Sequence, residues 1–169
     1  MKKNLVLLGM MAAGKTTLAK IVAKKLNCNF IDTDEVIVKN NSMSIIDIFK
    51  NKGESFFRTE EEKEVLKAVK KINSIISIGG GAFLNKKIRD NVLQNAISIW
   101  LNVDIETLQN RIKRNDKRPL LNVENYKAKL KELYLERKKI YLLADYKIDC
   151  GKLKKDVLVK KIIKLYSNE

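Results

Sequence analysis

The chain contains no histidine, one proline, two cysteines and only seven glycines among its 169 residues. The lack of histidine excludes histidine acid–base catalysis and histidine metal sites, so proton transfer has to fall to a carboxylate, a lysine or a tyrosine. Cys28 and Cys150 form no Cys-x-x-Cys pair, which argues against a disulfide scaffold and predicts a reducing, cytoplasmic setting. No apolar run is long enough to span a bilayer, so we expect no membrane partner.

Basic residues outnumber acidic ones by 35 to 20, which gives a net charge of +15 at pH 7. Such a balance suits nucleic acid, a membrane surface or small anionic ligands. The lysines are scattered over polar helix faces without interleaved stacking aromatics, so we expect no nucleic-acid partner. Only six of the basic residues are arginines, and each is a candidate for a site that needs a planar, bidentate cation, although sequence drift explains a single arginine equally well. These arginines are Arg58, Arg89, Arg111, Arg114, Arg118 and Arg137.

Short apolar runs alternate with longer segments of helical periodicity along the whole chain. The runs are NLVLLG, NFID, SIISIG, AISIWL and YKIDC. This alternation predicts a parallel sheet covered by helices on both faces, and the first, third and fourth runs are apolar enough for central strands. Ser44 and Asp104 are expected to cap helix N-termini. No repeat or linker interrupts the pattern, so we expect one domain over residues 1–169.

The only proline, Pro119, lies in the segment RNDKRPLLNVEN, where helical periodicity lapses between Arg114 and Glu124. Charged residues are followed there by apolar ones. A segment of this kind predicts a mobile flap that closes over a negatively charged ligand.

Residues Gly9–Thr16 read GMMAAGKT and match the pattern G-x-x-x-x-G-K-[ST] between an apolar run and a helix. Gly9 and Gly14 permit the turn, and backbone N–H groups at a helix N-terminus hold phosphate oxygens. Lys15 is expected to reach the β and γ phosphates, and Thr16 to ligate Mg²⁺. The alternative, a strand-to-helix turn with an incidental lysine, is disfavoured by this context.

The segment FIDTD places Asp32 and Asp34 near the carboxyl end of the second apolar run. If the strand continues, both side chains point the same way, at the edge where open α/β sheets bind ligands. One carboxylate can then hold Mg²⁺, and the other can accept a substrate hydroxyl and its proton. Alternatively, Asp34 simply caps the following helix.

Three consecutive glycines, Gly79–Gly81, follow the third apolar run and open at the same edge of the sheet. No lysine and hydroxyl pair follows them, so a second phosphate cradle is unexpected. Their position at this edge favours the floor of an acceptor pocket over a mere flexible turn. Arg137 lies on an apolar helical stripe and needs an anion opposite it, and Arg58 follows two phenylalanines. Two converging arginines would suit a ligand carboxylate.

The segments GMMAAGKTT, FIDTD, FFRTEE, GGGAF, RPLL and ERKKIYLLADY occur in an order and at intervals that resemble those of shikimate kinases. These are small members of the P-loop kinase group, related to nucleoside monophosphate kinases. The resemblance covers nearly the whole chain. It implies a three-layer α/β/α fold with a five-stranded parallel sheet, a substrate-binding helical region at about 33–61 and a mobile lid at about 112–124.

The resemblance also implies transfer of the ATP γ-phosphoryl group to the 3-hydroxyl of shikimate with Mg²⁺, in the chorismate route to aromatic amino acids, and we expect a cytoplasmic monomer. It implies that the catalytic residues are Asp34, Lys15 and Arg118, and that the metal is held by Thr16 and Asp32. The residues that it implies for ATP binding are Gly9, Ala12, Ala13, Gly14, Lys15, Thr16, Thr17, Arg111 and Arg118. Those that it implies for shikimate binding are Asp34, Arg58, Gly80, Gly81 and Arg137.

Some features depart from the family pattern or leave alternatives open. Ala12 stands where the family usually has glycine, and Arg89 and Arg114 match no motif and are expected to be solvated. A related small-metabolite kinase, such as a gluconate kinase, would share the phosphate chemistry, but the two arginines and the triple glycine argue against it. A nucleotide-dependent switch or nucleic-acid-binding P-loop protein is a further alternative, and the lack of an N-K-x-D motif argues against a GTP switch.

Overall fold

The computed structural model describes residues 3–112, 125–151 and 153–168. The predicted lid at about 112–124, with Arg114, Arg118 and Pro119, therefore lies outside the described residues except for Ile112.

Five parallel strands form one sheet, as the resemblance implied, in the order β2-β3-β1-β4-β5. The strands are β1 (Asn4–Leu8), β2 (Asn29–Asp32), β3 (Ser74–Ser77), β4 (Ala96–Asn102) and β5 (Tyr146–Asp149). The helices are α1 (Lys15–Leu26), α2 (Thr33–Asn41), α3 (Ile45–Val69), the short 3₁₀ helix η1 (Ala82–Leu84), α4 (Lys86–Asn95), α5 (Ile105–Ile112), α6 (Tyr126–Tyr141) and α7 (Lys155–Ser167).

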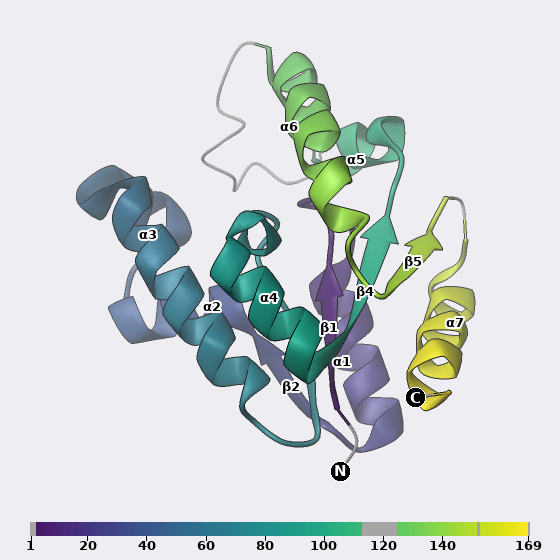
Figure 1. Ribbon diagram of the computed structural model, residues 1–169. Coiled ribbons are helices and arrows are strands. Elements are labelled where there is room, and N and C mark those ends of the chain that lie inside the picture. The colour runs from purple at the N-terminus through teal and green to yellow at the C-terminus, as the bar shows by residue number, and fades with distance from the viewer. Residues whose placement is uncertain (1–2, 113–124, 152, 169) are drawn as a thin grey trace.

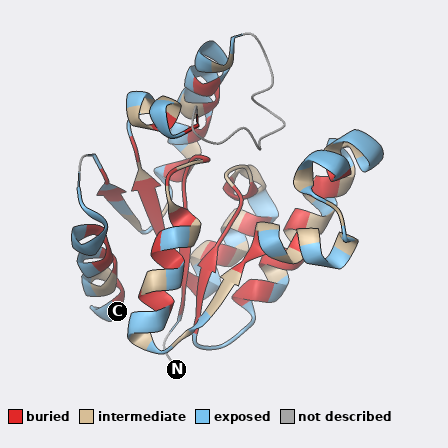
Figure 2. Cartoon of the chain, turned by 180° about the vertical axis from the view of Figure 1, so that it is seen from behind, coloured by how far each residue is buried: buried red, intermediate tan, exposed pale blue. Residues whose placement is uncertain are grey.

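Helices cover both faces of this sheet, with α1 and α7 on one side and α3 and α4 on the other (Figure 1). The strands β3, β1 and β4 occupy the centre and are buried almost throughout, whereas the edge strands β2 and β5 are partly exposed (Figure 2). Continuous apolar runs are what central parallel strands need, since both of their faces are covered. The predicted three-layer α/β/α class is confirmed.

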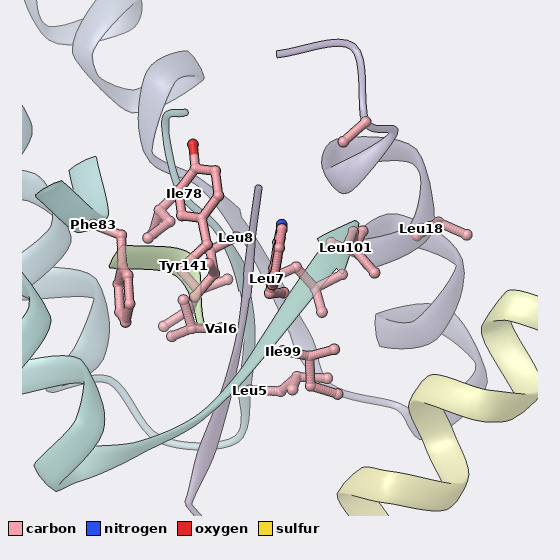
Figure 3. Packing of buried hydrophobic residues seen from close by; sticks show 14 of the residues in the cluster. Leu5, Val6, Leu7, Leu8, Leu18, Ile78, Phe83, Ile99, Leu101 and Tyr141 are labelled. Atoms are coloured by element: carbon pink, nitrogen blue, oxygen red, sulfur yellow. The ribbon is translucent and has the colours of Figure 1, made fainter. Parts of the chain in front are cut away.

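Successive side chains of β1 point to opposite faces of the sheet and pack into two halves of one core. In Figure 3, Leu5 and Leu7 lie with Ile99 and Leu18 on one face. On the other face Leu8 lies with side chains that include Phe83 and Tyr141. This alternation is the two-residue period of a strand. The side chains of β1 therefore fill the core on both faces of the sheet.

The strand register brings several loops to the same edge. Leu7 pairs with Ser77 and Ile99, and Asp32 also pairs with Ser77. The loops after β1, β2 and β3 consequently leave the sheet side by side at its carboxyl edge. In an open α/β sheet this is the edge where ligands bind.

Local signals set the beginnings of the helices. Ser44 Oγ accepts the Asp47 N–H at 3.1 Å, and Asp104 Oδ1 accepts the Thr107 N–H at 2.8 Å, so both predicted N-caps are confirmed. Helix α3 is kinked at Gly53, where φ is 83°. Near the kink a small second core buries Ile37, Ile48 and Phe57 between α2 and α3, which gives the helical region at about 33–61 its own packing.

Candidate functional site

The loop between β1 and α1 has the backbone geometry that a phosphate cradle requires. Gly9 and Gly14 have φ values of 139° and 91°, which favour glycine. A methyl group at Gly9 would lie 2.7 Å from the carbonyl oxygen of Leu101, so no larger residue fits there. Gly14 immediately precedes α1, and the first N–H groups of that helix face the loop without intrahelical partners.

Lys15 and Thr16 lie at the start of α1 with their side chains turned toward the loop and the sheet edge. The Lys15 ammonium donates to the carbonyl oxygens of Gly9 and Met10, each at 3.0 Å. Thr16 Oγ1 donates to Asp32 Oδ2 at 2.6 Å. The threonine hydroxyl and the aspartate are thus next to one another, as a shared metal site would need.

These two oxygen ligands suit Mg²⁺, a hard cation that keeps several waters and is held by few protein groups together with substrate phosphates. In the described ranges no cluster of three or more His, Cys, Asp or Glu residues could hold a metal by itself. The donor set therefore fits a metal that enters together with a nucleotide.

Asp34 does not lie where the strand pattern put it. Strand β2 ends at Asp32, and α2 begins at Thr33, so the strand does not continue to Asp34 and the condition for both carboxylates to point the same way is not met. Asp32, and not Asp34, caps α2, because its Oδ1 accepts the N–H groups of residues 34 and 35 at 3.0 and 3.3 Å. The helical turn carries Asp34 toward the triple glycine, where a methyl group at Gly79 would lie 2.9 Å from Asp34 Oδ1.

Arg58 and Arg137, which come from different helices, both reach the triple glycine. A methyl group at Gly81 would lie 2.6 Å from Arg58 Nη1, and one at Gly80 would lie 3.4 Å from Arg137 Nη1. The two guanidinium groups thus flank Gly80 and Gly81, a convergence that the sequence had left open. We refer to Asp34, Arg58, Glu61, Gly79–Gly81 and Arg137 as the acceptor side, and to Gly9–Thr16 with Asp32 and Arg111 as the phosphate side.

Arg137 is the most deeply placed cation of the acceptor side, with only 4% of its surface exposed. Its Nε is buried and has no hydrogen-bond partner among residues 3–112, 125–151 and 153–168. A buried charge with an unused donor is costly unless an anion completes its surroundings. The arrangement is thus suited to a ligand carboxylate.

Glu61 belongs to the acceptor side but was not among the predicted site residues. It is 2% exposed, and its Oε2 accepts a hydrogen bond from Arg58 Nη1 at 2.7 Å. Burial, together with the nearby charge of Asp34, raises the pKa of Glu61 above its ordinary value, although Arg58 and Arg137 act in the opposite direction. Its position three residues after an arginine on a helix was the signal that could have revealed the pair.

Arg111 on α5 lies against the phosphate side. Its Nη1 donates to the carbonyl oxygens of Ala12 and Ala13 at 3.1 and 3.3 Å. A cavity of about 300 Å³ opens beside it, lined by Ala12, Gly14, Lys15, Thr16, Thr17, Arg111 and Ile112. The structure thus gathers most of the predicted nucleotide-binding residues around one cavity.

The expectation that Arg89 is solvated is wrong. Arg89 is half-buried, and its Nη1 donates to the carbonyl oxygens of Phe83 and Leu84, each at 3.1 Å. It therefore ties down the turn that follows the triple glycine. An arginine that binds backbone carbonyls leaves no distinctive spacing in a sequence, which is why the pattern missed it.

Among the helices that the structure describes, none combines the length and the apolar character needed to cross a membrane. The family model for shikimate kinase matches residues 11–167. A shikimate kinase of Thermoanaerobacter pseudethanolicus is 40% identical over 97% of this chain and 96% of its own. The structure of shikimate kinase from Acinetobacter baumannii in complex with shikimate has a TM-score of 0.95 and 33% identity, covering 100% of this chain and 96% of that one. Shikimate kinase from Aquifex aeolicus gives a TM-score of 0.85 and 32% identity over 98% of this chain and 96% of that one. The chain belongs to the shikimate kinase family.

Proposed function

We propose that this protein transfers the γ-phosphoryl group of ATP to the 3-hydroxyl of shikimate, giving ADP and shikimate 3-phosphate on the route to chorismate and the aromatic amino acids. Membership of the family supports this activity, and the relative from Acinetobacter baumannii binds shikimate. The observation that carries the proposal is that Arg58 and Arg137 meet at Gly80 and Gly81, beside the phosphate cradle.

On the phosphate side, the N–H groups of the Gly9–Thr16 loop and the start of α1 would hold the phosphates of ATP. The Lys15 ammonium is hydrogen-bonded to two carbonyl oxygens of this loop. When ATP binds, it would donate to phosphate oxygens in place of these carbonyls. Thr16 and Asp32 would hold Mg²⁺, which neutralises charge on the transferring group when bound. Arg111, beside the cavity, would contact the nucleotide.

On the acceptor side, Arg58 and Arg137 would hold the carboxylate of shikimate, and the ring would lie against the bare backbone of Gly80 and Gly81. Asp34, directed at the same glycines, would accept the hydrogen bond of the reacting hydroxyl and take its proton as the oxygen attacks phosphorus. Positioning and charge neutralisation supply most of the catalysis of phosphoryl transfer. A site without histidine is therefore adequate.

We also propose that residues 33–61 form the substrate-binding region and that the protein acts as a cytoplasmic monomer without a nucleic-acid partner. The small core of Ile37, Ile48 and Phe57 supports the first of these points. Salt-dependent binding of random DNA at physiological ionic strength would contradict the last. The lid at about 112–124 and the role of Arg118 in it stay predictions.

The activity is tested by ADP release from MgATP with shikimate, quinate, gluconate and nucleoside monophosphates as acceptors. We expect acceleration by shikimate above all others. Preference for gluconate would favour the related small-metabolite kinase, and no acceleration by shikimate would exclude the proposed activity.

The arginine clamp is tested by Arg137→Lys. Loss of a buried bidentate contact should cost about 2 kcal/mol in shikimate binding, roughly thirtyfold in Kd, with little change for MgATP. Arg111→Lys is the matched variant on the phosphate side and should weaken MgATP binding with little change for shikimate. Equal losses of both ligands in Arg137→Lys would make Arg137 a structural residue.

A further inference from the structure

Tyr141, the last residue of α6, has one end in the core and the other at the acceptor side. It is 1% exposed, and its ring packs against Trp100 with the centroids 5.7 Å apart. In Figure 3 its hydroxyl points away from the packed side chains of the sheet. Packing on this scale fixes the ring, because aromatic side chains in cores have few alternative rotamers that fit.

The fixed hydroxyl lies beside two components of the acceptor side, the glycine run and Arg137. It donates a hydrogen bond to the carbonyl oxygen of Gly80. The guanidinium of Arg137, which lies beside the same glycine, is close enough for its charge to act on the pKa of the hydroxyl. Met10 Sδ of the phosphate loop lies 3.9 Å from the same oxygen. One phenol therefore connects the floor of the pocket with the cation beside it.

The hydroxyl remains a donor at every ordinary pH. Burial raises the pKa of Tyr141 to about 12, although the positive charge of Arg137 and its hydrogen bond act in the opposite direction. The phenol is consequently neutral and directed at Gly80. The carbonyl that it binds belongs to the least constrained segment of the site, because a run of three glycines has more backbone freedom than any other tripeptide.

We propose that Tyr141 is a positioning residue for the acceptor: its hydroxyl holds the Gly80 peptide and the Arg137 guanidinium in one fixed relation, so that the pocket is formed before shikimate arrives. The inference rests on the proposed function of the same site. Tyr141 then anchors the middle of the glycine run, and Arg89 anchors the turn that follows it by binding the carbonyls of Phe83 and Leu84. A site whose parts are held in place avoids the entropic cost of ordering them when the ligand binds.

The test is Tyr141→Phe, which removes one oxygen and keeps the ring that packs on Trp100. Left without its hydroxyl donor, the partly buried Gly80 carbonyl should turn to other partners, and KM for shikimate should rise about tenfold. KM for MgATP should stay within about twofold, because the bonds that Lys15 and Arg111 make to the phosphate loop are unchanged and only the weak contact with Met10 Sδ is lost.

Tyr134→Phe is the matched control on the same helix. Its hydroxyl donates to Asn102 Oδ1 at 2.9 Å, away from the glycine run. Both variants should lose similar thermal stability, and only Tyr141→Phe should lose affinity for shikimate. The rise in Tm that saturating shikimate produces gives a second readout, which needs no turnover and serves even if Tyr141→Phe is poorly stable.

Two outcomes would overturn the inference in distinguishable ways. If the wild type phosphorylates shikimate and Tyr141→Phe keeps its KM and its shikimate-induced Tm shift, Tyr141 is a core residue only and the proposed function survives. If shikimate neither accelerates ADP release nor raises Tm in the wild type, the proposed function fails and this inference fails with it.

Discussion

The phosphate side and the acceptor side of this site are neighbours in space but are constructed differently. The phosphate cradle is one stretch, Gly9–Thr16, whose main chain supplies most of the binding groups. The acceptor side is assembled from side chains on α2, α3 and α6 around a glycine run that follows β3. A backbone cradle is specified locally, whereas a side-chain pocket depends on the packing of separate elements.

This difference predicts how the two sides respond to change. A substitution in the cradle alters local backbone geometry, so its effects should remain with the nucleotide or with overall stability. A substitution on the acceptor side acts through a network in which Arg58, Glu61 and Arg137 influence one another. Specificity for the acceptor should accordingly be lost through residues that do not themselves contact it.

The largest effect is expected from Gly81→Ala. The new methyl group would lie 2.6 Å from Arg58 Nη1, and the guanidinium, the far end of a flexible side chain, has to move away. Gly81 has ordinary helical angles, with φ −95° and ψ −16°, so alanine introduces no backbone strain. We expect KM for shikimate to rise about thirtyfold, from loss of one charge-assisted contact, while thermal stability and KM for MgATP are retained.

Gly80→Ala is the comparison for Gly81→Ala, because its new methyl group would contact residues of both the phosphate side and the acceptor side. A methyl group there would lie 3.3 Å from the backbone nitrogen of Met11 and 3.4 Å from the carbonyl oxygen of Gly9, besides Arg137. It should therefore raise KM for both substrates. If Gly81→Ala also raised KM for MgATP, the proposal that a change on the acceptor side affects shikimate alone would be contradicted.

The sequence predicted the fold because each of its signals was local. Apolar runs such as SIISIG marked buried strands, and the motif Gly9–Thr16 marked the cradle through residue types that only such a turn requires. Parallel pairing then brought the strand ends together without any further information.

The acceptor side could be predicted only in part, because its geometry is tertiary. Asp32 and Asp34 were expected to point the same way if β2 continued, with Asp34 as a helix cap as the alternative. Instead, β2 ends at Asp32, which itself caps the helix that starts one residue later. In the sequence Glu61 cannot be told apart from an exposed helical acid, whereas in the structure it is buried beside Arg58. Such roles depend on which helix face packs inward, and charged residues carry no apolar period that would show it.

Glu61→Gln should have an intermediate effect that depends on pH. Because the pKa of Glu61 is raised in the folded protein, the folded state favours the protonated acid, and the wild type loses stability as pH rises through that pKa. Glutamine does not titrate, so the free energy of unfolding should be higher for the variant than for the wild type at pH 7, and the variant should be the more stable protein. The gain should vanish below about pH 4, where the wild-type acid is protonated in both states.

The same substitution should weaken acceptor binding, since Arg58 loses its ion pair with a buried carboxylate. We expect a rise of about fivefold in KM for shikimate. Glu54→Gln is the control, because Glu54 binds the same guanidinium at 3.0 Å but its side chain is 56% exposed, so stability and KM should hardly change. Chemical denaturation of both variants at several pH values measures their free energies of unfolding, and steady-state kinetics measures KM for shikimate. If Glu61→Gln were less stable than the wild type at pH 7, the predicted gain in stability would be contradicted.

The smallest effect is expected on the phosphate side, at Ala12. Its φ is 60°, a left-handed conformation that strains any residue with a Cβ. Ala12→Gly should remove this strain and raise the free energy of unfolding by about 1 kcal/mol, or Tm by about 2–4 °C. Ala13→Gly is the control, because Ala13 is buried and lacks a positive φ, and glycine there should lower stability. Thermal melts of both variants decide the sign. Both alanines bind Arg111 of the phosphate side through their carbonyl oxygens, and among the described residues neither is hydrogen-bonded to Arg58 or Arg137. Shikimate affinity should therefore be unchanged in both variants, since the effect stays within the cradle.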